Sequence, residues 1–274
     1  MLIDHEIKRK FIPELIVCYL QQNGVDFITS LPEDNNCTIS DIVKYCNDFS
    51  ANIGKSCIDF DTLVREAVSK GYDARYFSTD ESSDERYVDF NTFLISFNKI
   101  LEELNLIVSY ENKDVIVVGV GNGFEGKMLY NKIKNLTIVD IAPQSLCRAK
   151  SVLYQAKAYQ EDASNLASIM HDSFDLYISL RTYQSTYFDI RGALREAKRV
   201  LKSNGVIILS VACGYINKNK EFIYGLFNPH SGFLDKDRPD LFLNTIKNEL
   251  EQSNFKVVGI KKIPAEIFIY AVKY

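Results

Sequence analysis

The chain has 274 residues, of which 46% are apolar and 25% are charged, a composition typical of soluble globular proteins. Its net charge of −4 argues against binding of nucleic acid through clustered lysines and arginines. No apolar run reaches the roughly 18 residues of a membrane span, and the six cysteines form no C-x-x-C pair of the kind that zinc sites use. We therefore expect a cytoplasmic protein with free thiols, without a metal and without a membrane partner.

The first part of the chain, residues 1–95, shows helical periodicity and no glycine-punctuated strands. The segments with this pattern are Glu6–Gln22, Thr38–Phe49 and Asp59–Gly71. The opening segment contains acidic residues and a proline, so we interpret it as an amphipathic helix and not as a signal peptide. A polar, acidic stretch follows at Ser78–Arg86, and a longer helix is expected from Phe90 to Leu106. We expect residues 1–95 to form a helical region that covers a substrate pocket.

The second part, residues 96–274, alternates apolar strands with helical patterns. The predicted strands are 115–120, 136–141, 157–160, 174–179 and 205–211, and the predicted helices are 125–133, 144–154, 164–170, 190–201 and 241–253. This order predicts an α/β domain with a doubly wound, mostly parallel sheet. The last two strands, FKVVGIKKI and AEIFIYAVKY, are joined only at Pro264, so they must pair antiparallel as a C-terminal edge hairpin.

A bare backbone separates the first strand from the next helix in the segment VIVVGVGNGFEGKMLY. Glycines occupy alternate positions there, at Gly119, Gly121 and Gly123. Spaced glycines between a strand and a helix let a ligand approach the main chain at the carboxyl edge of the sheet. The second strand ends in Asp140, whose carboxylate can accept hydrogen bonds from both hydroxyls of a ribose. The ligand is therefore expected to contain a nucleoside.

These segments, taken in order, resemble the class I S-adenosylmethionine-dependent methyltransferases over residues 110–274. The matching pieces are VVGVGNG, VDI, EDA, FDLYISL and LKSNGVIILSV. The resemblance implies a seven-stranded sheet and the cofactor S-adenosylmethionine. It also implies that Gly119, Gly121 and Gly123 line the methionine part of the cofactor, while Asp140 holds the ribose and Ile141 packs on the adenine.

The same resemblance assigns positions after the third and fourth strands. It implies that Asp162 and Ala163 contact the edge of the adenine, and that Ser179 and Leu180 border the methyl group. The sequence departs from the family at Val117, where an acidic residue usually helps to hold the amino group of the methionine moiety.

Each of these features also has a structural interpretation. The glycines can serve tight packing, Asp140 can complement the dipole of the following helix, and Asp162 can cap a helix at Ser164. In addition, Gly121, Gly123 and Gly126 match the dinucleotide pattern G-x-G-x-x-G, which on its own is a weak signal.

The substrate side is expected in the segments after the fourth and fifth strands. Leu180–Asp189 contains Arg181, which can bind an anionic group of a substrate or pair with a structural acid, and Tyr183. The long segment Gly214–Asp240 contains His230, our candidate base.

We predict O- or N-methylation of a small molecule by direct displacement. The alternatives are an NAD(P)-dependent oxidoreductase and a non-catalytic binding module with a methyltransferase fold. The sequence identifies neither the methyl acceptor nor the oligomeric state.

Overall fold

The structure is a computed structural model that describes Ser69 and residues 90–105, 112–130, 132–184, 188–216, 221–228, 233–235, 237–263 and 266–274. The chain divides into two units, Met1–Ala74 and Arg75–Tyr274. Apart from Ser69, which is helical, the predicted helices before residue 78 and the acidic stretch lie outside the described residues, so the division into 1–95 and 96–274 stays a prediction. The second unit holds the elements described below.

A seven-stranded sheet forms the centre of the second unit. Its strands are β1 (Asp114–Val118), β2 (Asn135–Asp140), β3 (Lys157–Gln160), β4 (Phe174–Leu180), β5 (Leu201–Ala212), β10 (Phe255–Ile263) and β11 (Glu266–Lys273). Their order is β10-β11-β5-β4-β1-β2-β3. The pairs from β3 to β5 are parallel, whereas β11 lies antiparallel to both β5 and β10. The predicted mixed sheet with its antiparallel hairpin is confirmed.

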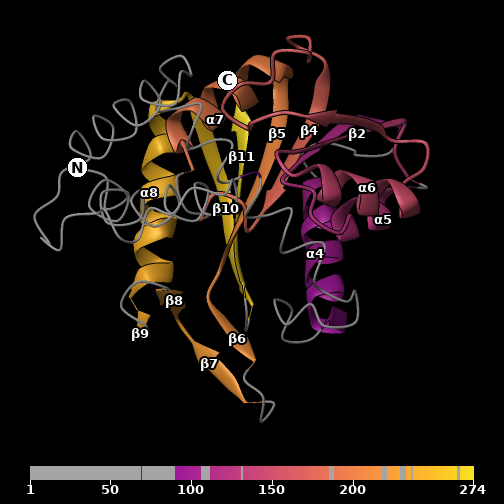
Figure 1. Cartoon of the computed structure of the whole chain (residues 1–274). Coiled ribbons are helices and arrows are strands. Elements are labelled where there is room, and N and C mark those ends of the chain that lie inside the picture. Colours follow the sequence, from indigo (N-terminus) through magenta and orange to yellow (C-terminus); the bar gives the residue numbers. More distant parts are fainter. Residues whose placement is uncertain are drawn as a thin grey trace, which may run out of the picture. The chain divides into compact units, whose positions relative to one another are not determined.

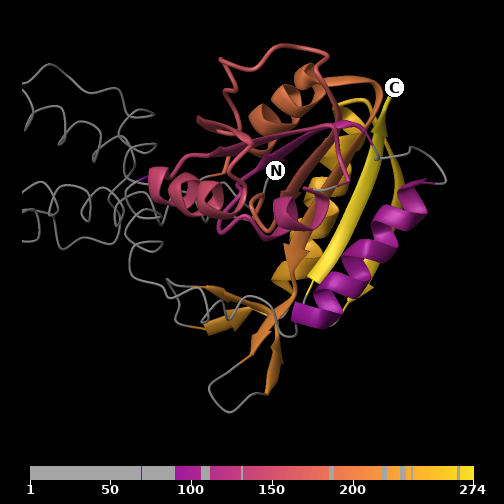
Figure 2. The ribbon, with the colours of Figure 1, turned by 90° about the vertical axis from the view of Figure 1, so that its right-hand side faces the viewer.

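Helices cover both faces of this sheet (Figure 1). One face packs against α4 (Phe90–Asn105), α5 (Phe124–Leu129) and α6 (Pro143–Val152), and the other against α7 (Ile190–Val200) and α8 (Arg238–Gln252). Figure 2 shows α4 running beside β11, where Glu103 accepts hydrogen bonds from Lys261 and Tyr270. Strands buried on two faces must be apolar along their length, and this explains the near-continuous apolar runs of β1, β4 and β5.

Helix α7 illustrates how the local sequence sets an element. The side chain of Asp189 caps its first turn by accepting a hydrogen bond from the Gly192 N–H at 3.0 Å. Its buried positions include Ile190, Ala193, Leu194 and Ala197, which recur at helical spacing and form one apolar stripe. The stripe packs into the core on the α8 side of the sheet.

The helix predicted at 164–170 does not form. This segment consists of turns and an isolated bridge between Asp162 and Asn165. Its backbone is held by α7 instead. The guanidinium of Arg199 donates to the carbonyls of Leu166 and Ile169, and Glu196 accepts from the Leu166 N–H. Tertiary hydrogen bonds satisfy the main chain here, so local periodicity did not decide its structure.

The segment predicted as one long loop, 214–240, contains short strands. They are β6 (Gly214–Ile216), β7 (Phe222–Tyr224), β8 (Leu226–Asn228) and β9 (Phe233–Asp235), which pair as β6-β7 and β8-β9. Figures 1 and 2 show the β6-β7 hairpin projecting from the end of β5. His230, the predicted base, lies outside the described residues.

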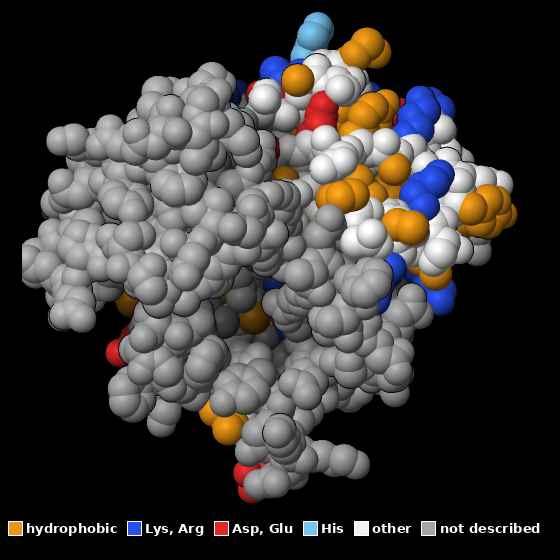
Figure 3. Space-filling view, viewed as in Figure 1, with side chains coloured by type: hydrophobic (Ala, Val, Ile, Leu, Met, Phe, Trp, Pro, Cys, Tyr) orange, Lys and Arg blue, Asp and Glu red, His pale blue; other side chains and the backbone are white. Residues whose placement is uncertain are grey.

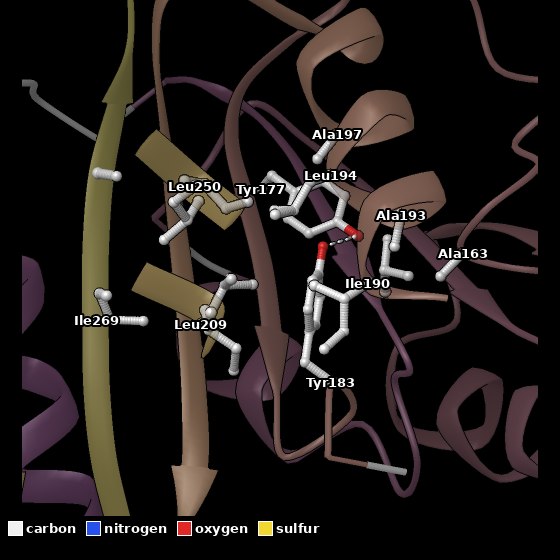
Figure 4. Close-up of a cluster of buried hydrophobic side chains, with 14 of the residues drawn as sticks. Ala163, Tyr177, Tyr183, Ile190, Ala193, Leu194, Ala197, Leu209, Leu250 and Ile269 are labelled. Atoms are coloured by element: carbon white, nitrogen blue, oxygen red, sulfur yellow. Dashed lines mark hydrogen bonds between the residues drawn. The ribbon is translucent and has the colours of Figure 1, made fainter. Parts of the chain in front are cut away.

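Two tyrosines form a buried polar pair inside the core on the α7 and α8 side (Figure 4). The hydroxyls of Tyr177 on β4 and Tyr183 lie 3.4 Å apart, and both side chains are buried. Burial raises the pKa of both phenols, so both are neutral at physiological pH. Each hydroxyl therefore gives the other a partner inside an apolar cluster.

We predict that Tyr183→Phe lowers the free energy of unfolding by about 1–2 kcal/mol, because it leaves the Tyr177 hydroxyl without that partner. Tyr177→Phe should have a similar effect. The double variant should lose less than the sum of the two single losses, as urea unfolding followed by circular dichroism will measure. Additive losses would contradict a coupled pair.

Candidate functional site

The carboxyl ends of the parallel strands converge on the turn between β1 and α5. Gly119, Gly121 and Gly123 have φ values of 73°, 53° and 80°, in the left-handed region that favours glycine. The turn is tied to the end of β2 by hydrogen bonds from the N–H groups of Gly119 and Val120 to the carbonyl of Val139. The glycine turn therefore lies at the carboxyl ends of β1 and β2, as the sequence analysis predicted.

The glycines in this turn have different surroundings. A Cβ at Gly119 would lie 2.1 Å from Oγ1 of Thr182, which follows β4. A Cβ at Gly123 would meet Ala149 of α6 and Leu153, which directly follows α6, and a Cβ at Gly126 would meet Leu153 and Leu136 of β2. The packing interpretation thus holds for Gly123 and Gly126, where α5 and α6 approach closely. Gly119 instead faces the segment after β4.

Asp140 is a buried acidic residue at the carboxyl ends of the parallel strands, beside the glycine turn. Its side chain is buried at the end of β2. Its carboxylate accepts hydrogen bonds from the Gly121 N–H at 3.1 Å, the Ala142 N–H at 3.0 Å and the Ser145 hydroxyl at 2.7 Å, and the Ile141 N–H also stabilises its charge. Asp140 therefore joins the glycine turn to the start of α6.

Burial is the main influence on the charge of Asp140. It raises the pKa of the carboxyl above its ordinary value, and the hydrogen bonds from Ala142, Ser145 and Gly121 offset part of that rise. Donors that approach this carboxylate from a ligand would stabilise its charged form further. A buried acid with a perturbed pKa beside a bare main-chain turn is typical of a functional site.

The other predicted cofactor residues lie on the strand ends around this turn. Ile141 is half-buried directly after β2. Asp162 accepts hydrogen bonds at 2.8 Å from the N–H and the hydroxyl of Ser164, so it caps a turn. Ala163 and Leu180 are buried, and the Ser179 hydroxyl donates to the Val118 carbonyl at 2.7 Å. Their roles toward a cofactor stay predictions.

Arg181 pairs with a structural acid. Its Nε and Nη2 atoms both lie 3.0 Å from Oε2 of Glu266, the first residue of β11. The two side chains are only 9% and 1% exposed. The Arg181 N–H, in a left-handed conformation with φ 58°, donates to the Ser210 hydroxyl, which in turn donates to Glu266. Of the two interpretations of Arg181, these contacts support the structural one.

Two further expectations change with the structure. Tyr183, predicted to face a substrate, lies in the core against Tyr177, so we do not carry it into the proposed site. Val117 is also buried in the core, on the face covered by α4, α5 and α6. Its position explains why an apolar residue is stable there.

Sequence reasoning missed three residues at this edge. Ser145 bonds both the Asp140 carboxylate and the Gly121 carbonyl, and a small polar residue in the helical turn after an acid could have signalled it. Thr182 and Glu266 carry no such signal. Thr182 reaches Gly119 only through the pairing of β4 with β1, and Glu266 reaches Arg181 only because β11 pairs with β5.

Comparison with known proteins agrees with this geometry. Residues 116–209 match the family model of a methyltransferase domain, Methyltransf_11. The Bacillus subtilis (strain 168) protein named "Putative methyltransferase YrhH" is 29% identical over 130 residues, which span 44% of this chain and 69% of that protein. Residues 116–209 of the second unit are thus similar to a methyltransferase domain.

Solved structures share the fold. The N-methyltransferase NodS from Bradyrhizobium japonicum WM9, solved with S-adenosylhomocysteine, has a TM-score of 0.52 at 14% identity, covering 75% of this chain and 98% of its own. The [4+2]-cyclase SpnF has a TM-score of 0.56 at 10% identity, covering 76% and 96%. The shared architecture therefore also occurs in a protein named for a cyclisation.

The described residues show neither a metal-binding cluster nor a membrane-spanning helix. No group of three or more His, Cys, Asp or Glu side chains there is placed to hold a metal ion. No helix in the same part of the chain combines the length and apolarity needed to cross a membrane. Of the described cysteines, Cys147 is exposed and Cys213 is buried, both as free thiols, and burial raises the pKa of Cys213 to about 11.

We predict that Glu266→Gln lowers the free energy of unfolding by about 3 kcal/mol or more, because it leaves the buried Arg181 charge without its counter-ion. The matched control is Glu249→Gln. Glu249 is also buried, but its partner Arg191 is 63% exposed and stays hydrated when the pair is lost. Urea unfolding should give a distinctly smaller loss for the control, and equal losses would contradict the structural role of the Arg181–Glu266 pair.

Proposed function

We propose that this protein is an S-adenosylmethionine-dependent methyltransferase that methylates an oxygen or nitrogen of a small molecule. The observation that carries the proposal is the buried Asp140 carboxylate beside the glycine turn at the carboxyl edge of the sheet. The methyltransferase family match over the same strands supports it.

The residues present fit the cofactor. The carboxylate of Asp140 has about four lone-pair positions, and the protein donors use most of them. A ribose diol can add to these bonds or replace the Ser145 bond, since that hydroxyl has a second acceptor in the Gly121 carbonyl at 2.9 Å. Of the glycines at 119, 121 and 123, Gly119 is half-buried, so its main chain is the part of the turn that we propose to border the amino-acid part of the cofactor.

The sheet order favours this cofactor over a dinucleotide. A doubly wound dinucleotide fold of the common type has six parallel strands in the order 3-2-1-4-5-6. Here the antiparallel β11 is inserted between β5 and β10. The G-x-G-x-x-G match is also accounted for in part by packing, because Gly123 and Gly126 make room for Ala149 and Leu153.

S-adenosylmethionine supplies, when bound, a methyl group on a positively charged sulfur. That methyl group would pass to the lone pair of the acceptor, and the electrons of the carbon–sulfur bond would remain on sulfur, which would become neutral. The protein then needs no acid for the leaving group. Its task is to hold the acceptor in line and to exclude water. A general base helps where the acceptor is a hydroxyl, because that proton must leave, and we keep His230 as the candidate.

On the face shown in Figure 3, the described residues form no continuous basic patch, and this favours a small acceptor over nucleic acid. In the view of Figure 3, the lysine and arginine side chains of the described residues are scattered among uncharged groups. A surface that follows a phosphate backbone would gather them in a continuous patch. The hairpins after β5 are the described segments that we propose to contact the acceptor.

We predict that S-adenosylhomocysteine binds with a dissociation constant in the micromolar range, and that Asp140→Asn weakens binding about tenfold or more by removing the acceptor for the ribose hydroxyls. The measurement is isothermal titration calorimetry on the full chain. Absence of binding to the unchanged protein would overturn the proposal.

Two controls separate ligand binding from loop structure. Ser145→Ala removes a protein hydrogen bond to Asp140 but keeps its carboxylate, so affinity should change far less than in Asp140→Asn. Asp172→Asn makes the same chemical change at an exposed site before β4, at the amino ends of the parallel strands. It should leave the affinity for S-adenosylhomocysteine unchanged. Asp172 has φ 48°, a conformation that asparagine tolerates well.

We also predict that binding of S-adenosylhomocysteine releases protons at mildly acidic pH. Burial raises the pKa of Asp140 in the free protein, and two ribose donors would lower it in the complex. Between these two pKa values the free protein binds more protons than the complex, so affinity rises with pH across that interval and is constant above it. Calorimetry in buffers of different ionisation enthalpy measures the release. The same release from Asp140→Asn would exclude Asp140 as its source.

A further inference from the structure

The missing acid at position 117 raises the question of what holds the amino group of the cofactor. Val117 is buried in the core, and its hydrocarbon side chain has no hydrogen-bond acceptor. An ammonium group needs acceptors for its three N–H donors. Those acceptors must come from other residues at the start of the glycine turn, where the methionine part of the cofactor is expected.

Thr182 places a hydroxyl at this point. Its Oγ1 atom would lie 2.1 Å from a Cβ at Gly119, so the hydroxyl sits directly against the first glycine of the turn. The side chain is half-buried, and its hydroxyl lies 3.2 Å from the Leu180 carbonyl and 3.4 Å from the Val118 carbonyl. A hydroxyl donates one proton, so its oxygen keeps lone pairs that can accept from a cation.

We propose that Thr182 is a cofactor-binding residue whose hydroxyl accepts a hydrogen bond from the amino group of the methionine moiety, in place of the acid absent at position 117. The inference rests on the proposed function. The neighbouring Leu180 carbonyl gives the cation a second acceptor close to the same hydroxyl. Both acceptors, the Thr182 hydroxyl and the Leu180 carbonyl, are uncharged. The amino group of the cofactor would therefore be held by charge-assisted hydrogen bonds and not by a counter-ion.

Glu125 is the competing candidate, because it is a buried acid in the first turn of α5. Charge alone would favour it. However, the contact with the first glycine of the turn is made by Thr182, and the Gly119 backbone is the part of the loop expected to border the methionine moiety. The two candidates predict different variants to lose recognition of the amine.

The test compares two ligands on the full chain by calorimetry. S-adenosylhomocysteine carries the amino group, and its deamino analogue keeps the carboxylate but lacks that group. Thr182→Val, which has nearly the same shape, should weaken S-adenosylhomocysteine roughly tenfold or more and leave the analogue nearly unchanged. Thr182→Ser, which keeps the hydroxyl, should restore most of the affinity. Thr245→Val on α8, whose hydroxyl bonds the Leu241 carbonyl, is the matched control.

The possible outcomes separate the inference about Thr182 from the proposed function. Loss confined to the ligand with the amino group, and rescued by serine, supports the inference. Equal affinity of Thr182→Val and the unchanged protein for both ligands overturns the inference and leaves the proposed function standing. Loss of amine recognition in Glu125→Gln in place of Thr182→Val also overturns it. Failure of the unchanged protein to bind either ligand overturns both the inference and the proposed function.

Discussion

The hydrogen bonding between Asp140 and the glycine turn is the interaction on which the candidate site depends. One buried carboxylate bonds the Gly121 N–H, the Ala142 N–H and the Ser145 hydroxyl, so the turn, the end of β2 and the start of α6 share a single anchor. Removing a carboxylate from water is costly, and these donors compensate for part of the cost. The donors of a ribose would add to the same group. Under the proposed function, folding and cofactor binding would use the same oxygen atoms, and Ser145, whose hydroxyl has an alternative acceptor, would be the donor to release its bond.

Short polar side chains tie the remaining strand ends together at the same edge. Ser179 bonds the carbonyl that ends β1, Ser210 links the Arg181 backbone to Glu266, and Thr182 lies against Gly119. Each of these hydroxyls satisfies a main-chain group or a buried charge. Together they hold β1, β4, β5 and β11 in register where the reaction would take place. A rigid set of strand ends would support precise placement of a methyl donor. The hairpins after β5 are then available for recognition of the acceptor.

The architecture itself does not determine the reaction. The shared fold includes an N-methyltransferase solved with S-adenosylhomocysteine and a [4+2]-cyclase. What differs between such proteins lies in the side chains that surround the acceptor. In this chain the strongest departure from the family pattern is Val117, and the burial of that residue moves the question of amine recognition to the segment after β4.

The sequence alone determined the sheet, most of its helices and the position of Asp140, because strands buried on both faces must be continuously apolar and a turn with left-handed φ values must be rich in glycine. It could not determine contacts between segments far apart in the chain. The turns at 164–170 depend on Arg199, the pairing of Arg181 depends on Glu266, and the core position of Tyr183 depends on Tyr177. In each case the partner is brought close by strand order or helix packing, so only the tertiary structure could decide whether the side chain is structural or available to a ligand.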